Sequence, residues 1–178
     1  MPACTQPVLP FGAYVMSIIK SMYKTGDRIQ IGCKTGFKQS GNPYRICMSG
    51  RWTAFQFQCK GISCGVPPSI NNGFKQFNST GYNATVRYWC KNGFTLNDDK
   101  TKRCTAKKRW EKPTPKCLPD CKNPVILNAF VDNPKSKYAS GDRVTFKCKK
   151  GYQSQGVPSA LCFMGRWKSI SFICIKKI

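Results

Sequence analysis

The stretch Gly26-Asp27-Arg28-Ile29-Gln30-Ile31-Gly32-Cys33-Lys34-Thr35-Gly36-Phe37 decides the fold, because two later parts of the chain repeat its pattern. Each copy starts with a turn, continues as a strand with alternating side chains, reaches a cysteine and ends on glycine plus an aromatic residue. The other copies are Asn83-Ala84-Thr85-Val86-Arg87-Tyr88-Trp89-Cys90-Lys91-Asn92-Gly93-Phe94 and Gly141-Asp142-Arg143-Val144-Thr145-Phe146-Lys147-Cys148-Lys149-Lys150-Gly151-Tyr152. Such recurrence indicates a chain of repeated units rather than one domain around one core.

Alternation within these strands predicts which side chains face the interior, because successive residues of a strand point to opposite faces. We expect the apolar residues inside and one arginine per strand outside. The inward residues are Ile29, Ile31, Val86, Tyr88, Val144 and Phe146, and the outward arginines are Arg28, Arg87 and Arg143.

The twelve cysteines of this 178-residue chain extend the repeat over its whole length. They form three sets of four, each with one tryptophan between its third and fourth members. The sets are Cys4, Cys33, Cys47 and Cys59 with Trp52; Cys64, Cys90, Cys104 and Cys117 with Trp110; and Cys121, Cys148, Cys162 and Cys174 with Trp167. Successive cysteines are separated by 28, 13 and 11 residues in the first set, 25, 13 and 12 in the second, and 26, 13 and 11 in the third. The repeated position of these tryptophans predicts that they lie in the cores.

Units of roughly 55–60 residues bury too little apolar surface to be stable without cross-links. Two disulfides in each unit would supply them, and the even number of cysteines leaves none over. The spacing alone allows three connectivities per unit. Disulfides imply an oxidising compartment, so we expect a secreted, extracellular protein.

Metal binding and catalysis are the rival uses of these residues, and the sequence favours neither. Structural zinc sites use paired cysteines at short spacing such as C-x2-C, and this chain has no such pair and no histidine. Its closest cysteines, Cys117 and Cys121, are separated by three residues and lie at a boundary between repeats. Without histidine there is no Ser-His-Asp or Cys-His arrangement. We therefore expect no enzyme activity, no metal and no cofactor.

The combination of four cysteines, a tryptophan between the last two, a Gly-aromatic step after the second and very short linkers resembles the complement control protein module, also called the sushi domain. The resemblance covers nearly the whole chain, three times over. It implies pairing of the first cysteine with the third and of the second with the fourth. The implied pairs are Cys4–Cys47, Cys33–Cys59, Cys64–Cys104, Cys90–Cys117, Cys121–Cys162 and Cys148–Cys174. Asn83 departs from the pattern, since the other two copies have glycine at this turn position.

The fold class expected from these features is all-β, with three small disulfide-stapled antiparallel β modules in an extended, bead-like array. The expected domains are residues 1–60, 61–118 and 119–178. They are joined by the linkers Lys60-Gly61-Ile62-Ser63 and Leu118-Pro119-Asp120, which are too short to let the modules fold back freely.

Charge is the chemically informative feature, because 30 Lys and Arg residues face seven acidic residues and give a net charge of +23. A solvated surface that only maintained solubility would intersperse both signs. An excess of this size creates a positive field that favours anionic partners. The basic residues that cluster in the sequence are the candidate polyanion-binding residues: Lys100, Lys102, Arg103, Lys107, Lys108, Arg109, Lys112, Lys147, Lys149 and Lys150. Strand alternation would put Lys100 and Lys102 on one face.

An anionic polysaccharide or a sialylated surface fits a secreted protein better than nucleic acid, the other polyanion with which Lys, Arg and aromatic residues interact. Trp89 takes a place held by Gly32 and Lys147 in the other repeats, which makes it the candidate contact aromatic, with module-specific packing as the alternative. Two sequons predict glycosylation at Asn78 and Asn83.

No secretory leader is visible, and Met1 is interpreted as a start added to a mature fragment. The most apolar stretch, Phe11 to Ile19, is too short to span a bilayer, and we expect it to be module core or strand.

The resemblance points to the factor H-like regulators of complement. It implies a non-enzymatic recognition protein that binds anionic host surfaces and a complement component. The alternative is a cytokine- or receptor-binding immunomodulator, and a third interpretation is an adhesion or coat role in which the modules are spacers.

Overall fold

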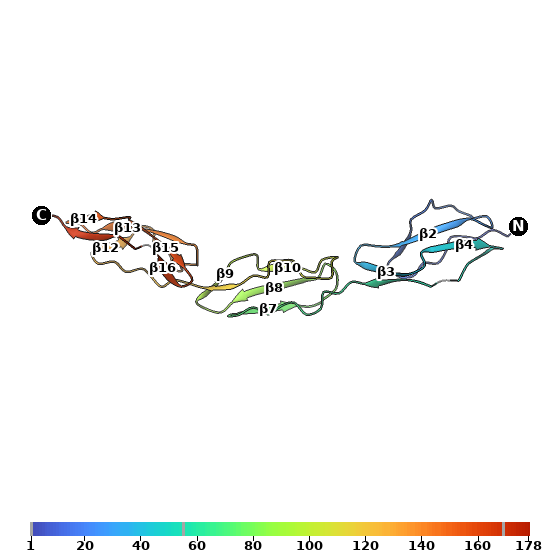
Figure 1. The fold of residues 1–178 in the computed structure, drawn as a ribbon, viewed down its shortest axis with the longest axis horizontal. Coiled ribbons are helices and arrows are strands. Elements are labelled where there is room, and N and C mark those ends of the chain that lie inside the picture. Colours follow the sequence, from blue (N-terminus) through green and yellow to red (C-terminus); the bar gives the residue numbers. More distant parts are fainter. Residues whose placement is uncertain (1, 55, 169) are drawn as a thin grey trace. The chain divides into compact units, whose positions relative to one another are not determined.

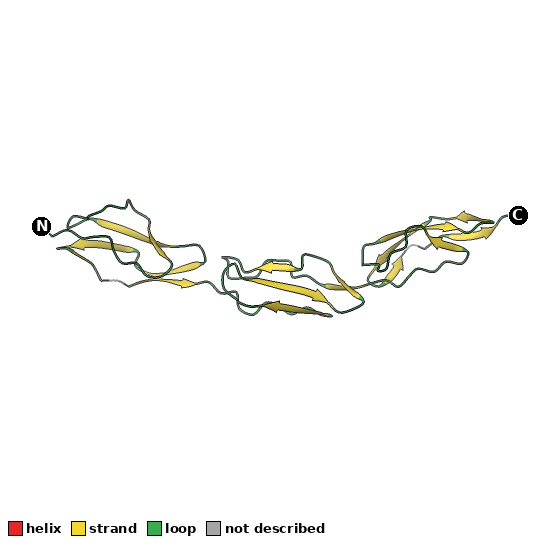
Figure 2. Cartoon of the chain, turned by 180° about the vertical axis from the view of Figure 1, so that it is seen from behind, coloured by secondary structure: helices red, strands yellow, loops and turns green. Residues whose placement is uncertain are grey.

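The computed structural model describes residues 2–54, 56–168 and 170–178, and all regular elements of this part of the chain are β-strands (Figure 1). Figure 2 shows only strands joined by loops along the described residues. The all-β class expected from the alternating pattern is therefore confirmed.

The strands follow the three repeats. The first repeat contains β1 (Ala13–Val15), β2 (Arg28–Cys33), β3 (Phe37–Gly41), β4 (Tyr44–Met48), β5 (Arg51–Trp52) and β6 (Phe57–Gly61). The second contains β7 (Gly73–Phe77), β8 (Thr85–Cys90), β9 (Phe94–Leu96), β10 (Thr101–Arg103) and β11 (Cys117–Pro119). The third contains β12 (Ala129–Val131), β13 (Arg143–Cys148), β14 (Tyr152–Gln155), β15 (Ser159–Phe163), β16 (Arg166–Lys168) and β17 (Ile173–Lys176).

Two small sheets occur in each repeat. The larger sheets have the strand orders β1-β2-β4-β5, β10-β8-β7 and β12-β13-β15-β16, and the smaller ones pair β3 with β6, β11 with β9 and β14 with β17. In the first repeat Arg28 lies opposite Ile46, and in the third Arg143 lies opposite Leu161, so the registers correspond.

The alternation expected for the strands before the second cysteines is confirmed. In β2, β8 and β13 the three arginines are exposed and the six apolar side chains are buried. The hydrophobic core of the first repeat consists of Cys4, Ala13, Tyr23, Ile29, Ile31, Cys47 and Phe57, and that of the third consists of Cys121, Tyr138, Val144, Phe146, Ala160, Cys162 and Phe172. These cores are small, as the length of the repeats requires.

Each repeat contains two internal disulfides. The six bonds are Cys4–Cys47, Cys33–Cys59, Cys64–Cys104, Cys90–Cys117, Cys121–Cys162 and Cys148–Cys174. Each joins the first cysteine of a set to the third, or the second to the fourth. The bonds tie each large sheet to segments far away in the sequence.

The repeated tryptophans close one end of each repeat through the same hydrogen bond. The indole N–H of Trp52, Trp110 or Trp167 donates to the backbone carbonyl of the residue that follows the first cysteine, at 2.8–3.0 Å. Trp110 is buried, whereas Trp52 and Trp167 are half-buried and pack edge-on against Tyr23 and Tyr138. The tryptophans were expected in the cores, and only Trp110 is fully buried there. Trp52 and Trp167 pack against their cores but remain half-buried.

Asn83 takes the same turn conformation as the glycines of the other repeats. Its φ is 64°, against 96° at Gly26 and 101° at Gly141, and all three residues donate their N–H to the third cysteine's carbonyl. Asparagine tolerates this left-handed region better than other residues with a side chain. The departure from the repeat therefore leaves the turn unchanged.

The expectation that the apolar stretch 11–19 is core or strand holds only in part. Ala13–Val15 forms β1 and Ala13 is buried, but Phe11 is 86% exposed and Ile18 is 83% exposed. The reason is that only the three residues of β1 pair with β2, so Phe11 before the strand and Ile18 after it lie outside the sheet.

Candidate functional site

The basic cluster at residues 107–109 lies in the hairpin turn that leads from the third cysteine of the second repeat to its tryptophan. Two hydrogen bonds close the turn: Thr105 N–H donates to the Arg109 carbonyl at 3.0 Å, and Lys108 N–H donates to the Thr105 carbonyl at 3.1 Å. The Thr105 hydroxyl also donates to the Arg109 carbonyl at 2.7 Å. Lys107, Lys108 and Arg109 are all exposed, so this closed turn presents three cations to solvent.

This turn is one residue longer than its counterparts in the first and third repeats. In the first and third repeats a two-residue loop, Ser49-Gly50 or Met164-Gly165, joins the strands, with both residues at positive φ. Such loops match the twist of the flanking strands. In the second repeat five residues separate Cys104 from Trp110, and Lys108 takes the positive φ of 58°.

Lys102 does not belong to this exposed surface, so its expected place beside Lys100 is wrong. Lys102 is only 7% exposed and its ammonium contacts the Asp98 carboxylate at 3.0 Å, whereas Lys100 is exposed. Lys100 precedes β10 while Lys102 lies within it, on the face that turns to the interior. Its charge is neutralised inside the repeat and is unavailable to an external anion.

The remaining candidates of the second repeat are exposed. Arg103 donates from Nη1 to the Asn83 side-chain oxygen at 3.1 Å, and its backbone N–H donates to the Glu111 carboxylate at 2.9 Å. Lys112 follows the turn and is exposed as well. Arg103 therefore stands beside the turn with a fixed orientation.

Of the three candidate lysines of the third repeat, one forms an ion pair and two are exposed in a turn. Lys147 lies on the exposed face of β13, where its ammonium pairs with Asp132 at 2.7 Å. Lys149 and Lys150 lie in the turn between β13 and β14, and both are exposed. Lys147 is therefore partly neutralised, and the other two present their charges to solvent.

Most of the acidic side chains form ion pairs with lysines. Among the described residues, five aspartates each pair with a lysine at 2.7–3.2 Å: Asp27 with Lys20, Asp98 with Lys102, Asp120 with Lys137, Asp132 with Lys147 and Asp142 with Lys135. The hydrogen bond from Lys20 and the backbone N–H of Lys24 hold the pKa of Asp27 below its ordinary value. Because these carboxylates are paired, the charge left exposed is overwhelmingly positive.

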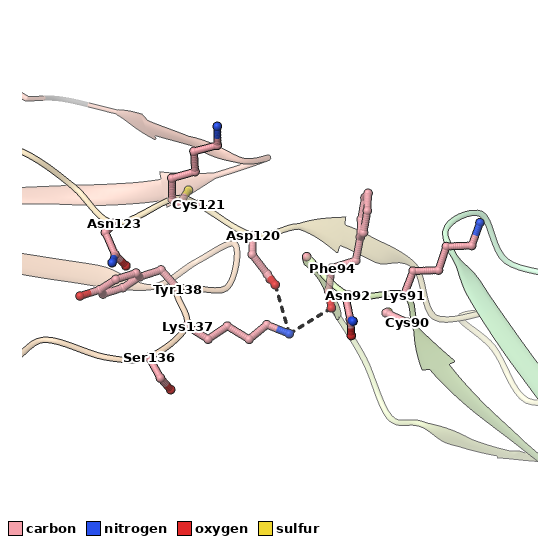
Figure 3. Close-up of a pocket in the computed structure, with 12 residues that line it drawn as sticks. Cys90, Lys91, Asn92, Phe94, Asp120, Cys121, Asn123, Ser136, Lys137 and Tyr138 are labelled. Atoms are coloured by element: carbon pink, nitrogen blue, oxygen red, sulfur yellow. Dashed lines mark hydrogen bonds and ion pairs between the residues drawn. The ribbon is translucent and has the colours of Figure 1, made fainter.

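One of these pairs lies where the second repeat meets the linker to the third, in the pocket of Figure 3. The Lys137 ammonium donates to the Phe94 carbonyl and contacts the Asp120 carboxylate, each at 3.1 Å (Figure 3). The other oxygen of Asp120 accepts the Thr95 hydroxyl at 2.7 Å. The carboxylate is almost fully enclosed, which makes this pocket a structural junction instead of an anion site.

Trp89 is 41% exposed, on the outer face of β8. Its ring lies 5.8 Å from that of Phe74 on the neighbouring strand β7, and the two planes are inclined by 30°. The structure thus places Trp89 within a partly exposed aromatic pair, and Phe74 is a contact candidate that the sequence reasoning missed. A signal was available, because each repeat has a small residue followed by an aromatic residue at this place: Ala13-Tyr14, Gly73-Phe74 and Ala129-Phe130.

The two sequons lie on exposed segments of the second repeat. Asn78 and Asn83 are both exposed, and the hydroxyl of Thr80 in the first sequon hydrogen-bonds Ser63 at 2.9 Å. Glycosylation at either position remains a prediction.

No group of three His, Cys, Asp or Glu side chains in the described residues is arranged to hold a metal ion. Within the same residues, no helix has the length and apolar character needed to cross a bilayer.

Comparison with known proteins identifies the repeats. The Sushi repeat (SCR repeat) family matches residues 4–59, 64–117 and 121–174. The chain belongs to this family. Three tandem sushi repeats account for the cysteine sets, the tryptophan positions and the paired small sheets described above.

Several curated proteins with sushi repeats are similar to the chain. Complement factor H of Mus musculus is 32% identical over 156 residues, which are 85% of this chain and 12% of that protein. C4b-binding protein of Mus musculus is 28% identical over 168 residues, 92% of this chain and 34% of that protein. The Sushi, von Willebrand factor type A, EGF and pentraxin domain-containing protein 1 of Mus musculus is 30% identical over 172 residues, 93% of this chain and 5% of that protein. The chain therefore spans about a third or less of the relatives it matches, and its sushi repeats relate it to complement regulators.

Proposed function

We propose that these sushi repeats form a non-enzymatic recognition segment of a secreted complement regulator, which binds anionic host surfaces such as glycosaminoglycans or sialylated glycans. The observation that carries the proposal is the pairing of five aspartates with lysines of the same chain, which leaves few acidic side chains to offset the other cations. The net charge of +23 is thereby displayed almost entirely by exposed Lys and Arg side chains.

A field of this kind raises the local concentration of an anionic partner and speeds association, and salt weakens both effects. Lysine suits sulfate and carboxylate groups of variable geometry, because the ammonium acts as a point charge on a flexible stem. The turn at residues 107–109 is the strongest candidate contact, since it places three cations on a hydrogen-bonded loop.

A complement component is the protein partner that we propose beside the polyanion. Support comes from the similarity to complement factor H, to C4b-binding protein and to the human complement receptor type 2, which is 34% identical over 113 residues. C4b-binding protein is named for its ligand, which makes C4b the first component to test. In this arrangement the basic surface holds the protein on an anionic surface while another face contacts the component.

Heparin chromatography tests the polyanion part of this proposal. We expect the wild-type protein to elute well above physiological salt. The triple variant Lys107→Glu, Lys108→Glu, Arg109→Glu should elute at markedly lower salt, because the turn would then repel sulfate groups. The matched control is Lys34→Glu, Lys38→Glu, Lys60→Glu, which changes the net charge equally on exposed lysines of the first repeat.

Equal losses in the two triple variants would mean that total charge, and not the turn, determines retention. Elution of the wild-type protein at or below physiological salt would overturn the proposal.

A specific protein partner, as in a cytokine- or receptor-binding immunomodulator, is the second candidate, and the surface of the first repeat favours it. Tyr14, Met16, Tyr44, Ile46 and Met48 are all exposed there. The Arg28 guanidinium lies over the Tyr44 ring, 3.7 Å from its centroid. Exposed Tyr, Met and Arg are enriched at protein interfaces. Weak heparin retention in the experiment above would favour this second function.

A further inference from the structure

We infer that the outer face of β7 and β8 in the second repeat is a subsite for one sugar ring of an anionic polysaccharide, stacked on Trp89 and Phe74. The inference deepens the proposed function and rests on it. It adds a place where the ring itself is recognised, whereas the basic turn contacts only the charged groups.

The two aromatic side chains form the platform. Phe74 is 47% exposed and Trp89 is 41% exposed, and their rings lie 5.8 Å apart at a shallow inclination of 30°. Large aromatic side chains are normally buried, so two neighbouring rings that remain in solvent indicate a contact surface. The face of such a ring carries partial negative charge, and it attracts the weakly positive C–H groups on the flat side of a sugar.

The fold does not require an aromatic residue at the position of Trp89, although the position of Phe74 is aromatic in every repeat. In the first repeat Tyr14 takes the place of Phe74 and lies opposite Gly32, which takes the place of Trp89. In the third repeat Phe130 and Lys147 hold these two positions. The backbone hydrogen bonds that align the strands are equivalent, since Lys34, Lys91 and Lys149 donate their N–H to the carbonyls of Gly12, Asn72 and Asn128. Glycine and lysine both occupy the site of Trp89 in the same architecture, so packing does not explain the tryptophan.

Cations border the platform. The Lys91 ammonium lies 6.0 Å from the centre of the Phe74 ring, and Arg87 is exposed two residues before Trp89, on the same face of β8. Neither β7 nor β8 contains an acidic residue. The Asp98 carboxylate nearby in the sequence is paired with the buried Lys102. The face therefore fits a ligand with a flat, apolar side and negative groups at its edge, which describes a sulfated or carboxylated pyranose.

Titration with a heparin-derived tetrasaccharide tests the subsite in the full chain. We expect Trp89→Ala to weaken binding by roughly tenfold, the scale of one lost aromatic stack. Phe74→Ala should weaken it less. The matched control is Phe130→Ala, because Phe130 holds the same position in the third repeat, is 50% exposed and lies opposite a lysine. Its affinity should equal that of the wild-type protein.

Two further readouts separate stacking from charge and from loss of fold. Trp89→Ala removes no charge, so the dependence of affinity on salt should keep its wild-type slope, while the triple Glu variant of residues 107–109 should show a smaller slope. In nuclear magnetic resonance spectra the indole N–H signal of Trp89, assigned with Trp89→Phe, should move on titration. The signals of Trp52, Trp110 and Trp167, whose indoles donate to backbone carbonyls, should stay.

Wild-type affinity in both Trp89→Ala and Phe74→Ala would overturn the subsite, and so would an unmoved Trp89 signal at saturation. If the triple Glu variant still loses affinity in that case, the proposed function stands without the subsite. Failure of the wild-type protein to bind the tetrasaccharide would overturn both. Stronger, Trp89-dependent binding of single-stranded DNA would show that the platform stacks bases and not sugars.

Discussion

Lys102 carries a positive charge into the second repeat, where it meets Asp98 at 3.0 Å in a setting that excludes most water from the ammonium. Removing an ion from water is costly, and a partner at hydrogen-bond distance offsets that cost. Replacing the whole pair by apolar groups is often neutral, whereas removing one member leaves a buried charge alone. The pair is therefore a contribution to stability that depends on both residues.

We predict that Asp98→Asn lowers the free energy of unfolding, because it leaves the Lys102 ammonium buried without its counter-ion. Lys102→Met should be far less damaging, since the charge and its desolvation disappear together. The double variant should recover most of the loss. Denaturant unfolding of the three variants measures the effect, and an unchanged Asp98→Asn protein would contradict it.

The same pair predicts a pH dependence. Hydrogen bonds from Lys102 and from the Asp99 backbone N–H hold the pKa of Asp98 below its ordinary value of 3.8. A carboxyl group with a lowered folded-state pKa stabilises the protein above its unfolded pKa, and the stabilisation is lost as pH falls through the folded pKa. The difference between wild type and Asp98→Asn should thus be constant near neutral pH and should shrink below about pH 4. A difference that grew with acid would be inconsistent with the ion pair.

In the small sheet of the first repeat, two strands place residues of like charge opposite each other. Lys38 on β3 lies directly across from Lys60 on β6, and both side chains are exposed. Opposed like charges on an antiparallel pair destabilise it, and opposite charges stabilise it. The equivalent sheet of the third repeat pairs Gln153 with Ile175 and avoids the repulsion.

Lys60→Glu should therefore raise the free energy of unfolding by about 0.2–1 kcal/mol. The gain should diminish as salt screens the exposed pair. Lys34→Glu is the control, because Lys34 is exposed but lies outside both strands. Thermal unfolding at low and high salt would detect the effect, and an equal gain in both variants would assign it to net charge alone.

Over the whole molecule, covalent links take the place of a large interior. Each repeat has a small set of buried hydrophobic residues and two disulfides. A cross-link restricts the unfolded chain and so favours the folded state. This arrangement leaves the outer faces available for Lys and Arg, which account for the net charge of +23.

Removal of one bridge by Cys33→Ala and Cys59→Ala should lower the free energy of unfolding of the first repeat by about 2–5 kcal/mol. Differential scanning calorimetry would follow the change, with reduction of the wild-type protein as the limiting case. Free thiols in the untreated protein, or no change in the doubly substituted one, would contradict this account.

The sequence by itself determined the repeat and the strands around the second cysteines, because strand alternation follows rules that act over a few residues. It left the turn at Asn83 open, and the structure gives that turn the positive φ of the glycines in the other repeats. The sequence also left the disulfide pairing open until the family resemblance supplied it. Lys102 was misplaced, although it lies two residues before the third cysteine, as do Arg45 and Ala160, which are also buried. That comparison along the repeats would have placed it inside.

Only the tertiary structure decided which charges are neutralised and which side chains meet. The approach of Phe74 to Trp89 and the opposition of Lys38 and Lys60 depend on how separate strands align side by side. The exposure of Phe11 and Ile18 depends on where the chain enters and leaves the sheet. Such contacts join residues far apart in the sequence, and no local pattern specifies their register.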